Sequence, residues 1–128
     1  MGEDVKDLSA SEARIMKIVW DGGGVVPMQE IIERLKNDYG KDYSRNSVTT
    51  FITRMAEKGY VDSYKKGRNA YIVALRNRDE YAYQQLCRAK DMWYAGKASN
   101  LMSALVKRDA ITREEISEIR RIFDELDD

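Results

Sequence analysis

The segment from Ser44 to Lys58 carries side chains whose types and spacing suit contact with double-stranded DNA. If the segment is helical, one face holds three threonines, one asparagine and two arginines. These side chains can hydrogen-bond to base edges in a major groove or hold backbone phosphates. Threonine has a modest helix propensity, so helix stability alone does not explain this face. The residues are Arg45, Asn46, Thr49, Thr50, Thr53 and Arg54.

A second group of cations follows at once, at the turn of a predicted β-ribbon. β-Branched and aromatic residues dominate its arms, 60–65 and 70–75, and Gly67 can adopt the positive φ of a tight turn. We expect Asn46, Thr49 and Thr50 to contact base edges. Phosphate contacts are expected mostly from Arg45, Thr53, Arg54, Lys65, Lys66 and Arg68. The plain alternative is that helix face and ribbon turn are solvated surface.

The predicted helix has clear ends and one apolar side. Ser44 suits the N-cap and Gly59 the left-handed position that follows a helix, while Lys58 lies in the last turn. Apolar residues recur at the spacing of a single buried stripe, which turns the polar face outward. They are Val48, Phe51, Ile52 and Met55.

Two further helices are predicted before it. Ser9 and Glu12 form a capping box that opens a helix to about Trp20. After a glycine turn and a very short strand edge at 25–26, Pro27 fits the first position of a second helix, which Gly40 ends. Three helices followed by a basic ribbon are typical of a winged helix-turn-helix.

Charge is distributed unevenly along the 128 residues, although the net charge is zero. Residues 41–76 carry eight Lys and Arg against three Asp and Glu, whereas residues 109–128 carry three against eight. A basic middle and an acidic end indicate one surface for a polyanion and another for something else.

Composition argues against an enzyme. The chain has no histidine and a single cysteine, Cys87, so the commonest general base, metal ligand and disulfide framework are missing. We expect no catalytic residues, cofactor or metal. The acidic start at residues 1–4 does not resemble a signal peptide, and the sequence has no 18-residue apolar span. A cytoplasmic protein without membrane contact is therefore expected.

The last third of the sequence predicts three helices with narrow apolar stripes. The first begins near Asn77 and runs to about Gly96, and the last begins at the capping box of Thr112 and Glu115. About fifty residues cannot easily bury these stripes alone, so a two-fold dimer is expected, the alternative being a helical cap on the winged domain. The expected dimerisation residues are Leu86, Trp93, Leu101, Met102, Leu105, Val106, Ile116, Ile119 and Phe123. The predicted fold is mainly α with a small β-ribbon, divided into a DNA-binding domain (1–76) and a helical dimerisation domain (77–128).

Two motifs resemble the BlaI/MecI family of bacterial penicillinase repressors. LSxxExxIMxIVW at residues 8–20 is similar to the opening helix of that family. TTxITRMxxKGYV at residues 49–61 is similar to its recognition helix and the exit into the wing. The tail from Asp79 to Leu126 resembles the family's three-helix dimerisation region. The resemblance implies a homodimeric repressor on a palindromic operator that controls β-lactamase or resistance-type genes.

The same resemblance implies induction by proteolysis, through a membrane sensor and cleavage in the dimerisation region. The matching bond joins Ala104 to Leu105, where family members carry an Asn-Phe bond. Family members also show Ser-Pro-Lys-Thr where this chain has Ser-Arg-Asn-Ser at 44–47, which affects the expected operator sequence rather than DNA binding. The copper-responsive branch carries a C-terminal Cys-x-Cys pair. No cysteine follows Cys87 here, so metal sensing is not expected.

Two other functions are compatible with the sequence. A small-molecule-responsive winged-helix regulator could use Tyr81, Tyr83, Trp93 and Tyr94 to line a pocket, although we expect these residues in helix packing. A winged-helix protein-interaction module could use the acidic tail to bind a basic partner. Binding to random duplex at low salt separates the second alternative from a DNA-binding protein.

Overall fold

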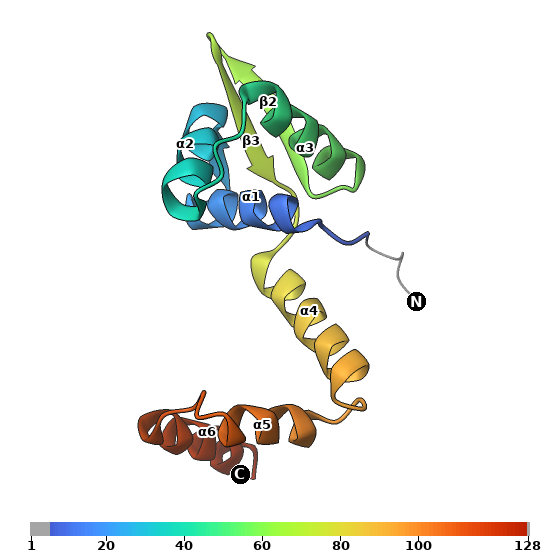
Figure 1. Ribbon diagram of the computed structural model, residues 1–128, viewed down its shortest axis with the longest axis vertical. Coiled ribbons are helices and arrows are strands. Elements are labelled where there is room, and N and C mark those ends of the chain that lie inside the picture. The colour runs from blue at the N-terminus through green and yellow to red at the C-terminus, as the bar shows by residue number, and fades with distance from the viewer. Residues whose placement is uncertain (1–5, 128) are drawn as a thin grey trace. The chain divides into compact units, whose positions relative to one another are not determined.

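The computed structural model describes residues 6–127, and the chain forms two compact units, Met1–Tyr81 and Ala82–Asp128 (Figure 1). The acidic start, predicted not to be a signal peptide, lies outside the described residues. The predicted fold class is confirmed: the chain is mainly helical with one small antiparallel sheet. None of the described helices is long and apolar enough to cross a membrane.

The first unit is a winged helix-turn-helix. Its helices are α1 (Ala10–Asp21), α2 (Met28–Tyr39) and α3 (Arg45–Glu57), and the start of α4 (Arg78–Trp93) also belongs to it. Its strands are β1 (Val25–Pro27), β2 (Val61–Lys66) and β3 (Asn69–Ala74). They form a sheet in the order β1-β3-β2, so the predicted ribbon has a third strand along its edge.

The position predicted for Pro27 was wrong. Pro27 ends β1, pairs with Tyr71 of β3 and is the N-cap of α2 rather than its first helical residue. Its backbone is extended (φ −67°, ψ 146°) because the strand pairing continues up to the helix start. The missing N–H of proline is tolerated here, since it lies at the end of an edge strand.

The other predicted helix ends of this unit are confirmed. Ser9 and Glu12 form the capping box of α1, and the Ser44 hydroxyl accepts a hydrogen bond from the backbone N–H of Ser47. Gly59 follows the C-cap of α3 with φ +85°, a conformation that non-glycine residues rarely adopt. These caps fix where α3 begins and where the chain turns into the wing.

The core of the first unit lies between the three helices and the inner face of the sheet. The apolar residues Ile15, Met16, Ile18 and Val19 of α1 are buried, as expected for a helix covered on more than one side. The apolar stripes of α2 and α3 meet them, with Ile32 and Phe51 half-buried at the edge. The largest fully buried side chains include Ile15, Met16, Ile18, Ile31, Leu35, Met55, Tyr60 and Ile72.

The second unit consists of the rest of α4, α5 (Ala98–Lys107) and α6 (Arg113–Leu126). The capping box of Thr112 and Glu115 is confirmed at the start of α6. The predicted extension of α4 to Gly96 was wrong, because the helix ends at Trp93 and Gly96 adopts φ +72° in the turn that follows. Glycine is the residue best suited to this positive φ.

Candidate nucleic-acid interface

The polar face of α3 is exposed along its whole length. All six predicted residues of this face are exposed, while Val48, Ile52 and Met55 on the other side are buried. Burial of that stripe fixes the rotation of the helix, so the polar residues form one continuous outward surface. The structure thus brings together Arg45, Asn46, Thr49, Thr50, Thr53 and Arg54 as predicted from their spacing.

The three threonines of this face are held in one orientation by their own helix. The hydroxyls of Thr49, Thr50 and Thr53 donate to the carbonyls of Arg45, Asn46 and Thr49 at 2.9, 3.0 and 2.9 Å. Each hydroxyl proton is therefore engaged, which leaves a methyl group and an oxygen acceptor for an external partner. A thymine methyl and an exocyclic amino group are the base-edge groups that match such a surface.

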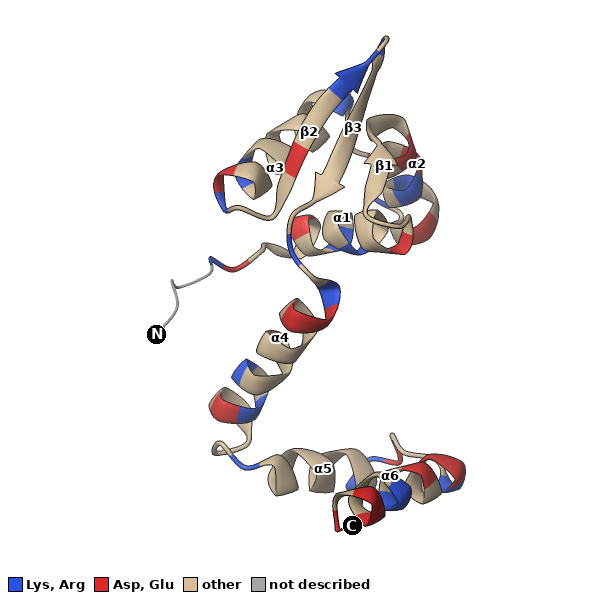
Figure 2. Cartoon of the chain, turned by 180° about the vertical axis from the view of Figure 1, so that it is seen from behind, with Lys and Arg blue, Asp and Glu red and all other residues tan. Residues whose placement is uncertain are grey.

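The wing carries three exposed cations around its turn. The strands β2 and β3 pair from Val61 with Ala74 to Lys66 with Asn69, and Gly67 takes φ +66° between them. Lys and Arg gather at this end of the ribbon, as Figure 2 shows. Successive side chains of a strand point to opposite faces, so Lys65 and Lys66 place positive charge on both sides of the wing.

The stem of the wing is stiffened by an aromatic pair. Tyr64 and Tyr71 lie opposite each other in the ladder, and their rings stack with 5.4 Å between centroids and 14° between planes. Such cross-strand aromatic pairs stabilise a ribbon that has few other neighbours. The cations at the turn are therefore carried on a defined rather than a loose arm.

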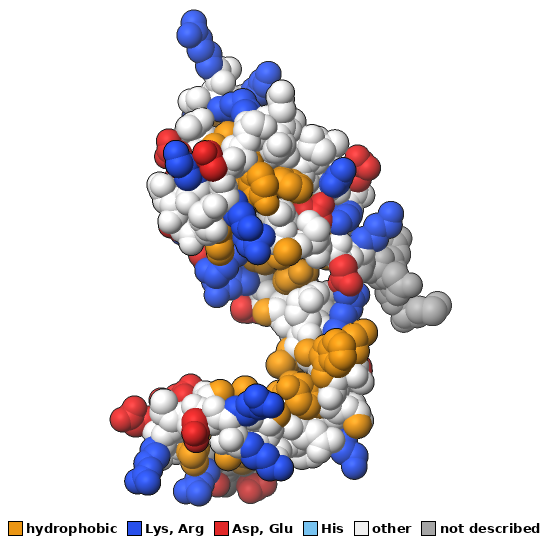
Figure 3. Space-filling model, in the orientation of Figure 1, with side chains coloured by type: hydrophobic (Ala, Val, Ile, Leu, Met, Phe, Trp, Pro, Cys, Tyr) orange, Lys and Arg blue, Asp and Glu red, His pale blue; other side chains and the backbone are white. Residues whose placement is uncertain are grey.

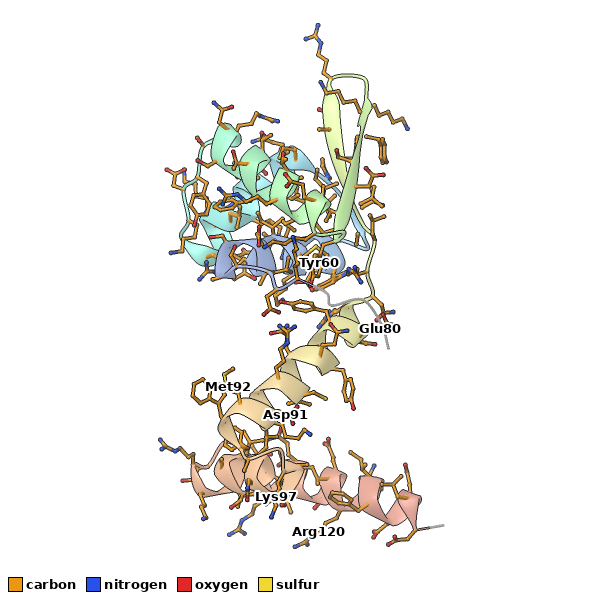
Figure 4. The ribbon with its side chains drawn as sticks, turned by 90° about the vertical axis from the view of Figure 1, so that its right-hand side faces the viewer. Tyr60, Glu80, Asp91, Met92, Lys97 and Arg120 are labelled. Atoms are coloured by element: carbon orange, nitrogen blue, oxygen red, sulfur yellow. The ribbon has the colours of Figure 1, made fainter. Side chains whose placement is uncertain are left out.

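The C-terminal end of α3 is anchored to the start of α1 by a buried ion pair. Lys58 Nζ donates to Glu12 Oε1 at 2.6 Å and to the carbonyl of Asp7 at 2.8 Å, and the Glu12 side chain is only 2% exposed. Tyr60, labelled in Figure 4, also donates its hydroxyl to the carbonyl of Lys6 at 2.7 Å. These contacts fix the end of α3 against α1.

Opposing effects act on the pKa of Glu12. Burial of the carboxyl acts to raise the pKa. Hydrogen bonds from Lys58 and from the Ser9 backbone, together with the Lys58 charge, outweigh burial and hold the pKa below its ordinary value. The carboxylate is therefore the stable form at neutral pH, and it remains available to anchor α3.

Two contacts of this surface were not predicted from the sequence. The sequence placed Lys58 only in the last turn of the helix, and it gave no role to Gln29 of α2, which accepts a hydrogen bond from Arg45. The paired residues are 46 and 16 positions apart. Helical periodicity covers spacings of three and four, so it could not have found either contact.

The surface described so far is the exposed polar face of α3 beside the cationic wing. Within residues 6–127, no group of three or more Cys, Asp and Glu is placed to hold a metal ion. The sequence model of the penicillinase repressor family matches residues 8–125. The chain belongs to this family.

The repressor is similar to several characterised members along almost its whole length. The methicillin resistance regulatory protein MecI of Staphylococcus aureus (strain N315) is 25% identical over 123 residues, which are 96% of this chain and 98% of that protein. The penicillinase repressor of Staphylococcus aureus is 22% identical over 120 residues, 94% and 93% of the two chains. The family consists of transcriptional repressors rather than enzymes, and this chain is a DNA-binding transcriptional repressor.

Solved structures support the fold of the repressor. The DNA-binding domain of the repressor BlaI aligns with a TM-score of 0.51 and 21% identity, covering 62% of this chain and 94% of that domain. RosR of H. salinarum aligns with a TM-score of 0.54 and 22% identity, covering 84% of this chain and 97% of its own. Both similarities confirm the winged-helix architecture.

Proposed function

We propose that the repressor acts as a homodimer on a palindromic operator, with one α3 in the major groove of each half-site. The observation that carries the proposal is the exposed polar face of α3 beside a cationic wing in one rigidly packed unit. A helix with such a face fits a major groove, and a wing with cations fits the flanking backbone. We also propose that the division into domains 1–76 and 77–128 separates DNA binding from dimerisation, and that the protein is cytoplasmic, where operator DNA lies.

The dimer is supported by apolar surface that the second unit leaves open. No described residue of α4, α5 or α6 is fully buried. Hydrophobic side chains gather over α4 in Figure 3, and Met92, labelled in Figure 4, is 71% exposed. Large open apolar patches mark interaction surfaces in soluble proteins, and a second copy would cover them on both chains at once.

The proposed dimerisation residues lie along these open stripes. Trp93 is 73% exposed, and Phe123 lines a groove of about 620 Å³ together with Met102 and Val106. A two-fold interface here would use no residue of α3 or the wing. The full proposed set is Leu86, Trp93, Leu101, Met102, Leu105, Val106, Ile116, Ile119 and Phe123.

Selection of genomic DNA fragments on the purified full-length protein tests the proposal. We expect recovery of sites with two inverted half-sites, protected over both halves by footprinting. Sedimentation in the micromolar range should show a dimer. A monomer that shifts no duplex even at low salt would contradict the proposal and favour a protein-interaction module.

Replacing Thr50 with Ala should weaken binding mainly at the selected operator. The substitution removes a methyl group and an acceptor that we assign to a base edge, and such contacts are worth about 1–3 kcal/mol of discrimination. The affinity for random duplex should stay nearly unchanged. Fluorescence anisotropy on operator and scrambled duplexes measures both affinities. Equal losses of affinity on the two duplexes would show that Thr50 contacts a phosphate rather than a base edge.

Replacing Lys66 with Ala should weaken binding to every duplex by a similar factor. Each protomer of the dimer loses one phosphate contact, which lowers the dependence of log Kd on log salt by about 0.9 for each half-site and by about 1.8 for the whole operator. Titrations at four salt concentrations measure this slope. Arg121→Ala on the exposed surface of α6 is the matched control and should leave the slope unchanged. An unaltered slope for Lys66→Ala would remove the wing turn from the interface.

We further propose that a sensor-linked protease inactivates the repressor by cutting between Ala104 and Leu105. This bond lies inside α5, whose Met102 and Val106 line the same groove as Phe123 of α6. A cut there would separate α6 from the DNA-binding unit, but the helix must unwind first to admit a protease. Mass spectrometry of cells under induction should show a fragment ending at Ala104, and an intact chain during derepression would contradict cleavage.

Direct regulation by a small molecule is the second candidate, favoured by one cavity. A cavity of about 290 Å³ between α4 and α5 is lined by Tyr83, Leu86, Cys87 and Lys90, among others. Tyr81, which the sequence also suggested for a pocket, instead packs against Trp20 and Tyr60 in the first unit. Ligand-induced release of operator by the uncut protein would favour this candidate over proteolysis.

A further inference from the structure

We propose that Gln29 is a positioning residue for DNA binding, which orients Arg45 so that Arg45 and Arg68 bind the same backbone phosphate. The inference rests on the proposed function and adds to it a residue of α2 and a defined phosphate site. Three elements contribute: the start of α2, the start of α3 and the turn of the wing.

The contact that carries the inference joins α2 to α3. Arg45 Nη2 donates to Gln29 Oε1 at 3.1 Å. The other end of the same amide is also engaged, because Gln29 Nε2 donates to Glu33 Oε1 at 3.3 Å, one turn further along α2. With its nitrogen held by Glu33, the amide presents its oxygen to the guanidinium. Arg45 is thereby kept in one orientation before any DNA arrives.

The position of Arg45 leaves its charge available for an anion. Arg45 is the first residue of α3, where the helix dipole disfavours a cation, and the first turn of α3 has no acidic residue. Its guanidinium donates to a neutral amide rather than to a carboxylate. An arginine placed against the dipole is best explained by an external anion, which both the guanidinium and the helix start would attract.

Arg45 and Arg68 line one small hollow. Its volume is about 30 Å³, which is enough for one or two oxygen atoms and too small for a base. None of the residues around it is acidic, and Asn69 adds a neutral polar group beside the two arginines. Two guanidinium groups from different elements around a site of this size fit a phosphate oxygen of a DNA strand.

The role of Gln29 is therefore to reduce the side-chain conformational entropy that Arg45 loses when it binds a phosphate. A free arginine gives up many rotamers when it meets a phosphate, whereas one already held by an amide gives up fewer. Gln29→Ala should weaken binding about 3- to 10-fold for each half-site on the scale of one immobilised side chain, and so about 10- to 100-fold on the two-half-site operator. Gln29 is exposed, so this substitution is not expected to lower the melting temperature.

A double-mutant cycle in the full-length protein tests whether Gln29 works through Arg45. Operator affinity is measured for wild type, Gln29→Ala, Arg45→Ala and the double variant, with Gln84→Ala on exposed α4 as the control. We expect Gln29→Ala to weaken binding in the wild-type background and to have no further effect once Arg45 is alanine. Equal losses in both backgrounds, or no loss in either, would overturn the inference.

The shared phosphate is tested with operators that carry one neutral methylphosphonate at successive positions. Wild type should show a position in each half-site where neutralisation weakens binding, and both Arg45→Ala and Arg68→Ala should lose the sensitivity at that same position. Two different positions for the two arginines would overturn the site. Failure of the wild-type protein to bind any duplex would instead reject the proposed function itself.

Discussion

A repressor carrying Phe123→Glu should sediment as a monomer at micromolar concentration and bind the two-half-site operator at least ~100-fold more weakly than wild type. Phe123 is 56% exposed in the single chain and lines the groove between α5 and α6. A glutamate there would place an unpaired charge in the proposed interface, which is strongly unfavourable. A monomer holds only one half-site, and loss of the second, linked binding event commonly reduces affinity by about 100- to 10,000-fold.

Two comparisons separate dimer loss from other damage. Ser117→Glu adds the same charge on the opposite side of α6, away from the stripe of Ile116, Ile119 and Phe123, and should remain dimeric. The affinity of Phe123→Glu for an isolated half-site should equal that of wild type, since α3 and the wing are untouched. A variant that stays dimeric, or that loses half-site binding with its helical circular dichroism intact, would contradict the proposed interface.

The sequence predicted the fold well wherever local chemistry decides it. Ser9 with Glu12, Ser44, Gly59 and the Thr112 capping box each act within one helix turn, and all lie where their spacing indicates. The third strand was harder to predict from the sequence, because β1 has only three residues and is defined as a strand by its pairing with β3. Pairing with β3 also explains the position of Pro27. Local preference predicted it as the first residue of α2, whereas it is the N-cap of that helix.

For the candidate site too, local spacing predicted some features and missed those that depend on tertiary packing. Helical spacing was sufficient to group the six polar residues of α3, because their common face follows from the buried stripe opposite. It could not show that Gln29 holds Arg45 or that Lys58 reaches Glu12, since these pairs form only when α2 and α1 pack against α3. The common exposed face of these six residues was thus predictable, and the residues that hold the face in place were not.

Lys58→Met should lower the free energy of unfolding by about 3 kcal/mol, the scale found when one partner of a buried ion pair is removed. The substitution leaves the Glu12 carboxylate 2% exposed and without its lysine. Glu12→Gln should cost less, because the amide oxygen can still accept from the Ser9 backbone N–H and Lys58 is 23% exposed to solvent. Urea unfolding followed by circular dichroism measures both.

Lys17→Met provides the matched control for this asymmetry. Lys17 and Asp21 form an ion pair of 2.8 Å on the surface of α1, where the lysine side chain is 59% exposed. Exposed pairs of this kind contribute about 0–1 kcal/mol, so the variant should unfold close to wild type. A loss as large as that of Lys58→Met would show that burial does not set the energetics of these pairs.

The pH dependence of stability distinguishes loss of the ion pair from loss of packing. The pKa of Glu12 lies below its ordinary 4.5 in the folded chain, so the carboxylate contributes stability that is fully present above pH 4.5 and is lost as the pH falls through the folded pKa. In Lys58→Met the hydrogen bond and the charge of the lysine no longer lower the pKa of Glu12, so this pKa rises relative to wild type. The difference in stability between wild type and Lys58→Met should therefore be largest at neutral pH and shrink in acid. A difference that is constant from pH 7 to pH 3 would assign the effect to the lysine stem, and the anchor of α3 would then be apolar packing rather than charge.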